Sequence, residues 1–303
     1  MELIRPDTRI DFIGKRKYAF IVSACVILIC FGSIILHGGL KYGVDFAGGI
    51  LLQIKFSKSI DISEVRNAME ALGSKDANVQ KFGGENEFLI RIEKSDEDLE
   101  VFSRKIQASL QEKFKDNKPE LRRVEVVGPK VGKDLKHKAL LAVLLSFGAI
   151  LVYVAFRFHT ISYGLGGIVA LVHDVIVTYG AISIFGIEYS LSTLAVILTI
   201  IGFSINDTIV IFDRVRENIK KLRKENLASV MNVSINETLG RTILTTGTVM
   251  MVVLILFFFG GPVIHDFATA MIVGLITGTY STIYIASPVV LVWDKYVTKR
   301  VRR

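Results

Sequence analysis

The stretch Thr199–Asn218 reads TIIGFSINDTIVIFDRVREN and combines the composition of a membrane-spanning helix with a carboxylate. Its first half is apolar, but Asn206 and Asp207 interrupt that run before the charged residues that begin at Asp213. An Asp at the centre of a spanning helix costs about 2.5–3.5 kcal/mol on insertion scales. Because a purely structural helix has no reason to carry that cost, the stretch predicts a membrane helix with an ion-handling group.

The composition as a whole is that of a membrane protein. The chain has 303 residues, of which 51% are hydrophobic and only 22% charged, and its mean hydropathy is +0.47. Its net charge of +8 suits either nucleic acid or an anionic membrane surface. Because the basic residues lie beside apolar segments and no nucleic-acid motif is present, the sequence favours a membrane surface and no nucleic-acid partner.

Six apolar runs reach the length of about 20 residues that a spanning helix needs. The predicted spans are residues 18–37, 138–158, 161–185, 191–212, 241–259 and 266–293, so the last five fill residues 138–293. The first run lacks a small-residue cleavage site, which indicates a retained span and not a signal peptide. Residues 214–240 mix apolar and charged side chains and predict an amphipathic segment on the cytoplasmic face, with a solvated linker helix as an equal alternative.

The distribution of Lys and Arg orients these spans. About five of these residues lie in residues 1–17, seven in residues 214–241 and five after residue 293, whereas the alternate loops GIEYS and GGPVIHD have none. By the positive-inside rule, the N-terminus (1–17) and the basic C-terminus (294–303) are cytoplasmic. We therefore expect a multi-pass protein of the cytoplasmic (inner) membrane, with residues 38–137 on the periplasmic side.

The segment 38–137 has the pattern of a small α+β domain. GGILLQIKF, NVQKF, EFLIRIE and LRRVEVV have strand character, and a turn at Gly83–Gly84 joins the second to the third. ISEVRNAMEALG and DLEVFSRKIQASLQEKF place apolar residues at helical spacing. The order βαββαβ predicts one extracytoplasmic ferredoxin-like domain between the first and second spans. No peptide groove is evident in its sequence.

The candidate site residues begin with Asp207, because ionisable groups inside spans are functional hypotheses by default. The alternative is a snorkelling or capping carboxylate. Arg241 opens the fifth span and stays charged, so it can tune a neighbouring carboxylate but cannot carry the proton. Asn206, Thr242 and Thr245 are supporting polar residues, although hydroxyl side chains are common in spanning helices.

His173 and Asp174 are adjacent polar residues near the middle of the third span. Neighbours on a helix point about 100° apart, so one could line a cavity while the other faces a helix. A role in a proton path and a paired structural role are equally favoured. No phosphate loop, metal-ligand cluster or nucleophile and base pair is present, so the sequence predicts a transport protein with no catalytic site and no cofactor.

Five motifs together resemble the SecD/SecF family of membrane subunits of the bacterial Sec protein-export machinery, on its SecF side. They are YGVDFAGG (42–49), VHD (172–174), GFSINDTIVIFDRVREN (202–218), NETLGRT (236–242) and FFGGPVIHDF (258–267). The resemblance covers essentially the whole chain. It implies membership of the resistance-nodulation-division superfamily and half of a 12-helix bundle, the other half coming from SecD, which is not fused to this chain.

The resemblance also implies a function and partners. A SecD/SecF pair associates with the SecY, SecE and SecG channel, with YajC and YidC as further partners, and uses the proton gradient to assist late export of preproteins after SecA has acted. In the family, the acid that matches Asp207 and the arginine that matches Arg241 are implicated in proton movement. Sodium as the driving ion stays open. The alternatives are a small-molecule or lipid exporter of the same superfamily and a scaffold without transport.

Overall fold

The computed structural model describes residues 9–74, 77–82, 84–92, 99–158 and 160–301. The chain divides into two compact units. The helical unit comprises Met1–Leu40, Ala142–Ile187 and Ser192–Arg303, and the α+β unit comprises Lys41–Leu141 and Glu188–Leu191. Within the described residues, six helices are long and apolar enough to cross a membrane, which confirms the predicted polytopic helical class.

The α+β unit contains a four-stranded antiparallel sheet in the strand order β2-β3-β1-β4. Its elements follow the chain as β1 (Gly49–Lys55), α3 (Ile62–Ala71), β2 (Asn78–Lys81), β3 (Glu87–Ile92), α4 (Leu99–Lys113) and β4 (Glu120–Val127). A short helix, α2 (Val44–Ala47), precedes the sheet, and a 3-10 turn, Lys115–Asn117, precedes β4. This order and pairing are those of a ferredoxin-like fold, as predicted. Gly83, one of the two residues of the expected Gly83–Gly84 turn, lies outside the described residues.

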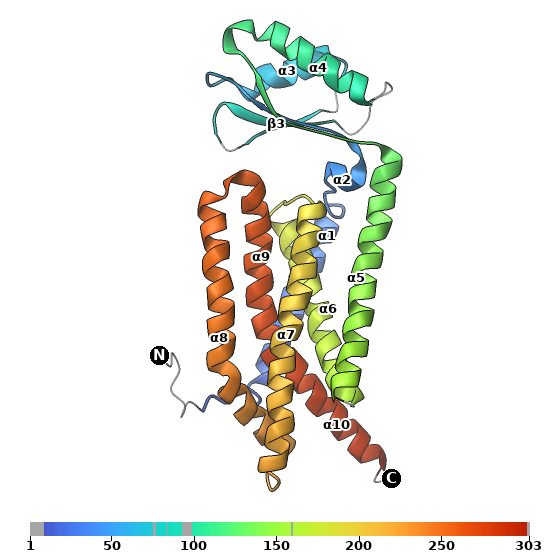
Figure 1. Cartoon of the computed structure of the whole chain (residues 1–303), viewed down its shortest axis with the longest axis vertical. Helices are drawn as coiled ribbons and strands as arrows, with labels where there is room; N and C mark the ends of the chain where they lie inside the picture. The colour runs from blue at the N-terminus through green and yellow to red at the C-terminus, as the bar shows by residue number, and fades with distance from the viewer. Residues whose placement is uncertain (1–8, 75–76, 83, 93–98, 159, 302–303) are drawn as a thin grey trace. The chain divides into compact units, whose positions relative to one another are not determined.

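The core of this unit lies between the sheet and its two long helices, α3 and α4, which cover one face of the sheet (Figure 1). Alternate residues of β1 point into this core because side chains alternate across a strand, and Ile50, Leu52 and Ile54 are buried together with Phe56 and Phe88. The segment Glu188–Leu191 also belongs to the α+β unit. Two side-chain contacts hold this segment in the unit. Glu188 pairs with Arg91 of β3, and Tyr189 stacks on Phe46 of α2.

The helical unit contains the membrane helices, which Figure 1 shows as long rods. They are α1 (Arg16–Leu36), α5 (Pro129–Phe158), α6 (Ile161–Ile184), α7 (Leu191–Lys221), α8 (Leu227–Phe259), α9 (Gly261–Ser281) and α10 (Ser287–Val301), with a π-helical turn, η2 (Thr282–Ala286), between the last two. Helix α5 begins before the expected start of the second span, and its first residues belong to the α+β unit. Helix α6 is largely buried and packs against α1, α9, η2 and α10.

The structure changes two details of the predicted spans. The stretch 214–240 is not a separate amphipathic helix, because α7 continues to Lys221 and α8 begins at Leu227. Some of its apolar residues are buried, such as Val215 and Val230, whereas Ile219 is exposed. Glu237 of α8 joins the two helices by accepting hydrogen bonds from Arg214 and Asn218 of α7. The last predicted span is one candidate span, Ile264–Tyr296, and it contains the π-helical turn η2. Pro288 lies just beyond that turn, and a proline ring clashes with the carbonyl four residues earlier, which widens the helix there.

Glycines allow the closest helix contacts in this unit. A Cβ added at Gly166 of α6 would lie 2.7 Å from the backbone oxygen of Ala286 in η2 and 2.8 Å from a methyl group of Val290. A Cβ at Gly278 of α9 would lie 3.2 Å from the Cβ of Ser204 in α7. Small residues at these positions let helix backbones approach each other, which is the usual basis of helix association in membranes.

Substituting Gly166 tests this packing. We expect Gly166→Ala to lower the free energy of unfolding by about 1–3 kcal/mol, because the new methyl group meets a backbone oxygen that cannot turn away. Gly148→Ala is the matched control, since a Cβ there has no neighbour within 4 Å. Thermal unfolding of the full chain in detergent micelles measures both, and equal midpoints for the two variants would contradict the assigned contact.

Candidate functional site

Asp207 is buried inside the helical unit, with 7% of its surface exposed. It lies on α7, and the Thr242 hydroxyl of α8 donates a hydrogen bond of 2.6 Å to its Oδ1 atom. Its other carboxylate oxygen, Oδ2, is buried and accepts no hydrogen bond within the described part of the chain. An unsatisfied buried oxygen costs free energy, so the carboxylate is ready to bind a proton or a donor supplied from elsewhere.

Arg241 does not form an ion pair with Asp207 among the described residues. Its side chain is exposed on α8, at the position just before Thr242. Asn206 is exposed as well, one position before the buried acid. The Thr245 hydroxyl donates to the Arg241 and Thr242 carbonyls of its own helix. The structure therefore brings Thr242 to Asp207 and leaves the other predicted polar residues on the outside of the helical unit.

His173 and Asp174 are both buried on α6 and hydrogen-bonded to each other. The distance from His173 Nδ1 to Asp174 Oδ1 is 3.2 Å, and Asp174 is fully buried. Hydroxyl groups from two further helices converge on the second carboxylate oxygen, Oδ2: Ser204 of α7 donates at 2.6 Å and Ser281 of α9 at 2.7 Å. Asp174 thus joins three helices through one carboxylate.

Further hydroxyl groups extend this arrangement between α7 and η2. The Thr208 and Thr282 hydroxyls lie 3.0 Å apart, and both are within hydrogen-bonding distance of the Ser204 carbonyl. The sequence analysis did not identify these residues or Ser281. Their positions in the sequence could have indicated them. Ser204 precedes Asp207 by about one turn of the same helix, and Ser281 adjoins the glycine-rich part of the last span.

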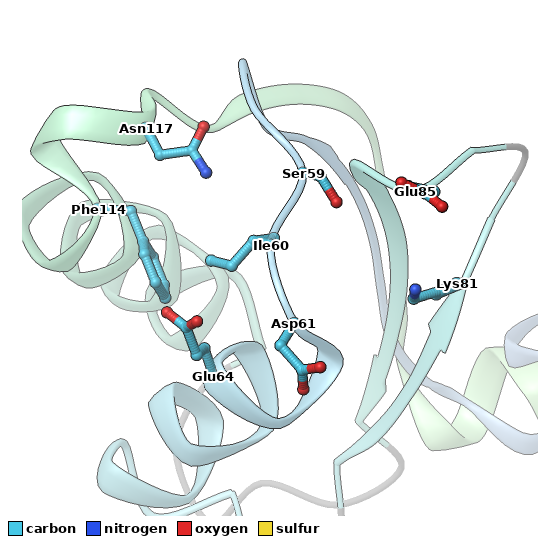
Figure 2. A pocket seen from close by; sticks show the side chains of 8 residues that line it. All are labelled: Ser59, Ile60, Asp61, Glu64, Lys81, Glu85, Phe114 and Asn117. Atoms are coloured by element: carbon cyan, nitrogen blue, oxygen red, sulfur yellow. The ribbon is translucent and has the colours of Figure 1, made fainter.

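The α+β unit has a pocket of its own, with a volume of about 410 Å³. Figure 2 shows Phe114 and Asn117 on one side of the Ser59–Asp61 segment and Lys81 and Glu85 on the other. Asp61 caps α3 by accepting a hydrogen bond from the Ser63 backbone N–H. The Ser63 side chain and, after it, this backbone bond hold the pKa of the Asp61 carboxyl below its usual range. In the described residues of the chain, no group of three or more His, Cys, Asp or Glu side chains is arranged to hold a metal ion.

Comparisons with protein families and known proteins show which family this chain belongs to. Residues 105–296 match the model of a family described as "Protein export membrane protein SecD/SecF, C-terminal". The chain belongs to the SecD/SecF family. Residues 33–60 match the model of the SecD/SecF GG motif, which covers the segment with Gly48 and Gly49 that leads into β1.

Relatives and solved structures agree with this family. The protein translocase subunit SecF of Calditerrivibrio nitroreducens is 45% identical over 100% of this chain and 98% of its own length. That of Pseudomonas aeruginosa is 42% identical over 94% of this chain and 91% of its own length. The crystal structure of SecDF, a translocon-associated membrane protein from Thermus thermophilus, matches with a TM-score of 0.84 and 36% identity. This chain is covered to 97% in that match and spans 40% of the SecDF chain.

The contact between Thr242 and Asp207 gives a prediction of its own. Thr242→Val keeps the shape of the side chain but removes the only hydrogen bond to Asp207 that the described chain provides, so we expect a loss of about 1–3 kcal/mol in the free energy of unfolding. Thr245→Val is the control, because that hydroxyl bonds only to its own helix and its loss should change stability little. Unfolding of both variants in detergent at neutral pH measures the difference, and a Thr242→Val variant as stable as the wild type would contradict the contact.

Proposed function

We propose that this chain is the SecF-type half of a SecD/SecF pair that uses the proton gradient to assist protein export across the cytoplasmic membrane. The observation that carries the proposal is a buried carboxylate on a membrane helix, Asp207, with one oxygen held by Thr242 and the other without a donor. Such a group can gain and lose a proton while its helix stays in place. Family membership and the translocase names of the relatives support export of proteins as the purpose.

The exposed face of α7 supports a partner that forms the other half of the bundle. Within residues 192–206, its exposed positions recur at alternating spacings of three and four, and they are small or polar: Ser192, Ala195, Thr199, Gly202 and Asn206. Lipid-facing positions need no such residues, as the exposed Leu, Val and Phe side chains of α5 show. Small residues at this spacing are typical of helix–helix contacts in membranes. Under the proposal, SecD covers this face.

The exposed polar residues of α8 fit the same interpretation. Arg241, Thr245 and Thr248 all lie on its exposed side, and a guanidinium facing lipid would be costly. A partner that covers α7 and α8 would surround Arg241 and supply a group for the free oxygen of Asp207. The proton site would then be completed only when two subunits meet.

The mechanism that follows is a cycle of charge at Asp207. Protonation removes a charge from the bundle and weakens the attraction between Asp207 and Arg241, and deprotonation restores both. One proton crossing a potential of 100 mV supplies about 2.3 kcal/mol, which is enough to change the balance between two packed arrangements. Under the proposal, both termini are cytoplasmic and the α+β unit is periplasmic, so it can act on the emerging chain beside the SecY, SecE and SecG channel, with YajC and YidC nearby.

Removing the charge of Asp207 tests the coupling. Asp207→Asn is nearly isosteric, so we expect the variant to copurify with SecD and to lose export stimulated by the proton gradient. The assay is translocation of a preprotein into inverted membrane vesicles, with and without a proton gradient. Asp213→Asn is the control, because that acid pairs with Arg157 at a helix end and lies away from Asp207. Full stimulation in Asp207→Asn would overturn the proposal, and the same assay with sodium in place of the proton gradient identifies the driving ion.

Arg241 allows charge and geometry to be separated. Arg241→Lys keeps the positive charge and loses the planar fork of donors, while Arg241→Gln loses the charge. Because Arg241 makes no direct ion pair with Asp207 in this chain, we expect Lys to retain most of the stimulated export and Gln to abolish it. The same vesicle assay measures both, and a Lys variant as defective as Gln would show that the fork itself binds a group of the partner.

A further inference from the structure

A second buried carboxylate in this chain has its own set of hydrogen bonds. Asp174 is fully buried, and no Lys or Arg side chain pairs with it in the described residues. The groups around it are hydroxyls, from Ser204 and Ser281, and one imidazole, from His173. A carboxylate without a cation inside a membrane bundle is costly unless it can bind a proton or has enough donors.

The imidazole beside Asp174 belongs to His173, and only one of its two nitrogens has a hydrogen-bond partner among the described residues. His173 is 6% exposed, and its Nδ1 atom faces Asp174 Oδ1, while its Nε2 atom is buried and has no hydrogen-bond partner among the residues that the structure describes. When the Nδ1–H group donates to an ionised Asp174, Nε2 carries a lone pair and can accept a proton. A buried polar atom without a partner calls for a reason, and proton transfer supplies one.

We infer that His173 and Asp174 form a second proton-binding site in the helical unit, with His173 Nε2 as its point of entry. A proton binds to Nε2, and the proton on Nδ1 moves to Asp174 Oδ1. The pair gains one proton, its charge changes from −1 to 0, and the new O–H group of Asp174 donates back to Nδ1. Asp174 Oδ2 accepts from Ser204 and Ser281 before and after the transfer, so the helices hold their positions while the charge changes.

Few other ionisable groups approach this pair in the described chain. From α9, the ring of Tyr280 lies 6.0 Å from the His173 ring, and its hydroxyl donates to the Ala19 carbonyl of α1. From η2, Tyr284 lies beside Tyr280, and from α7 the acid next to Ser204 along the helix is Asp207. In the described residues, α10 contributes neither a hydrogen bond nor an ion pair to His173 or Asp174. The pair can therefore change its charge without breaking an existing ion pair.

Ser204 places this site within about one helical turn of the first one. Ser204 bonds to Asp174 and precedes Asp207 by three residues on α7. Because both acids lie close to the same part of α7, a proton on one acid changes the electric field at the other. The inference rests on the proposed function only in taking the proton as the driving ion, and the site itself is separate.

Infrared difference spectroscopy can test the site in the full chain copurified with SecD and reconstituted in lipid nanodiscs. Lowering the pH converts ionised carboxylates to protonated ones, and isotope labelling of Asp identifies the carbonyl bands that appear. Among the labelled bands, we expect one component that Asp174→Asn removes and another that Asp207→Asn removes. Asn resembles the protonated form of Asp174 in shape, so this variant should retain its serine contacts and its assembly with SecD.

Kinetics separate a relay from a structural pair. After a rapid drop in pH, His173→Gln should slow the appearance of the Asp174 component by about 100-fold, at the lower end of what a positioned proton-transfer group contributes. The Asp207 component should appear at its usual rate in the same sample, which serves as the internal control. If Asp174→Asn fails to assemble, the His173→Gln time course decides alone, and an unchanged rate would overturn the relay.

The outcomes distinguish this inference from the proposed function. A spectrum of Asp174→Asn identical to that of the wild type, or loss of the whole signal in Asp207→Asn, would overturn the second site and leave the Asp207 site standing. Loss of a component in Asp174→Asn together with an unaffected Asp207→Asn spectrum would overturn the role of Asp207 and leave the second site standing.

Discussion

The helical unit depends on a single constraint, which is that a carboxylate enclosed by membrane helices needs donors from neighbouring helices. Two serine hydroxyls and an imidazole satisfy Asp174, and they come from α6, α7 and α9. These donors reach it because Gly278 brings α9 within van der Waals distance of Ser204. The π-helical turn at Thr282–Ala286 adds Thr282 to the same cluster. Tight packing and buried polarity are therefore two results of the same arrangement of helices.

The two buried acids, Asp174 and Asp207, differ in how many hydrogen-bond donors this chain supplies to their carboxylate oxygens. Asp174 lies at the centre, has donors on both oxygens and has no exposed surface. Asp207 lies closer to the exposed face of α7, and only one of its oxygens has a donor. The difference follows from position, because a group at the edge of a half-bundle has neighbours on one side only. Under the proposed function, SecD completes the Asp207 site, and the properties of such a site would change whenever the two subunits move.

Much of the fold could be predicted from the sequence, because hydrophobic length and alternation are local properties. The six spans and the βαββαβ order required no knowledge of distant contacts. The amphipathic stretch at 214–240 misled because charges among apolar residues also occur where two helix ends pack together. For the site, Asp207 and Asp174 were evident as acids in apolar runs. The donors were not evident, because serine and threonine are common in spanning helices and only tertiary contacts separate Ser204 and Ser281 from the rest.

Chain connectivity limits how motion at these acids can be transmitted. Asp174 lies on α6 and Asp207 on α7, and residues 185–190 join these helices. The end of this connection and the first residue of α7, Glu188–Leu191, belong to the α+β unit. This segment is held there by the pairing of Glu188 with the buried Arg91 of β3 and by a hydrogen bond of 2.9 Å from the Leu191 N–H to Asp45. A shift of α6 against α7 must therefore be absorbed by these four residues or passed to the sheet to which they are bound. If the segment were released from the sheet, the buried Arg91 would lose its partner, Glu188. Releasing the segment therefore costs more free energy than moving the sheet with it. Under the proposed function, a charge change at Asp207 that shifts α7 therefore has a short covalent route to the α+β unit.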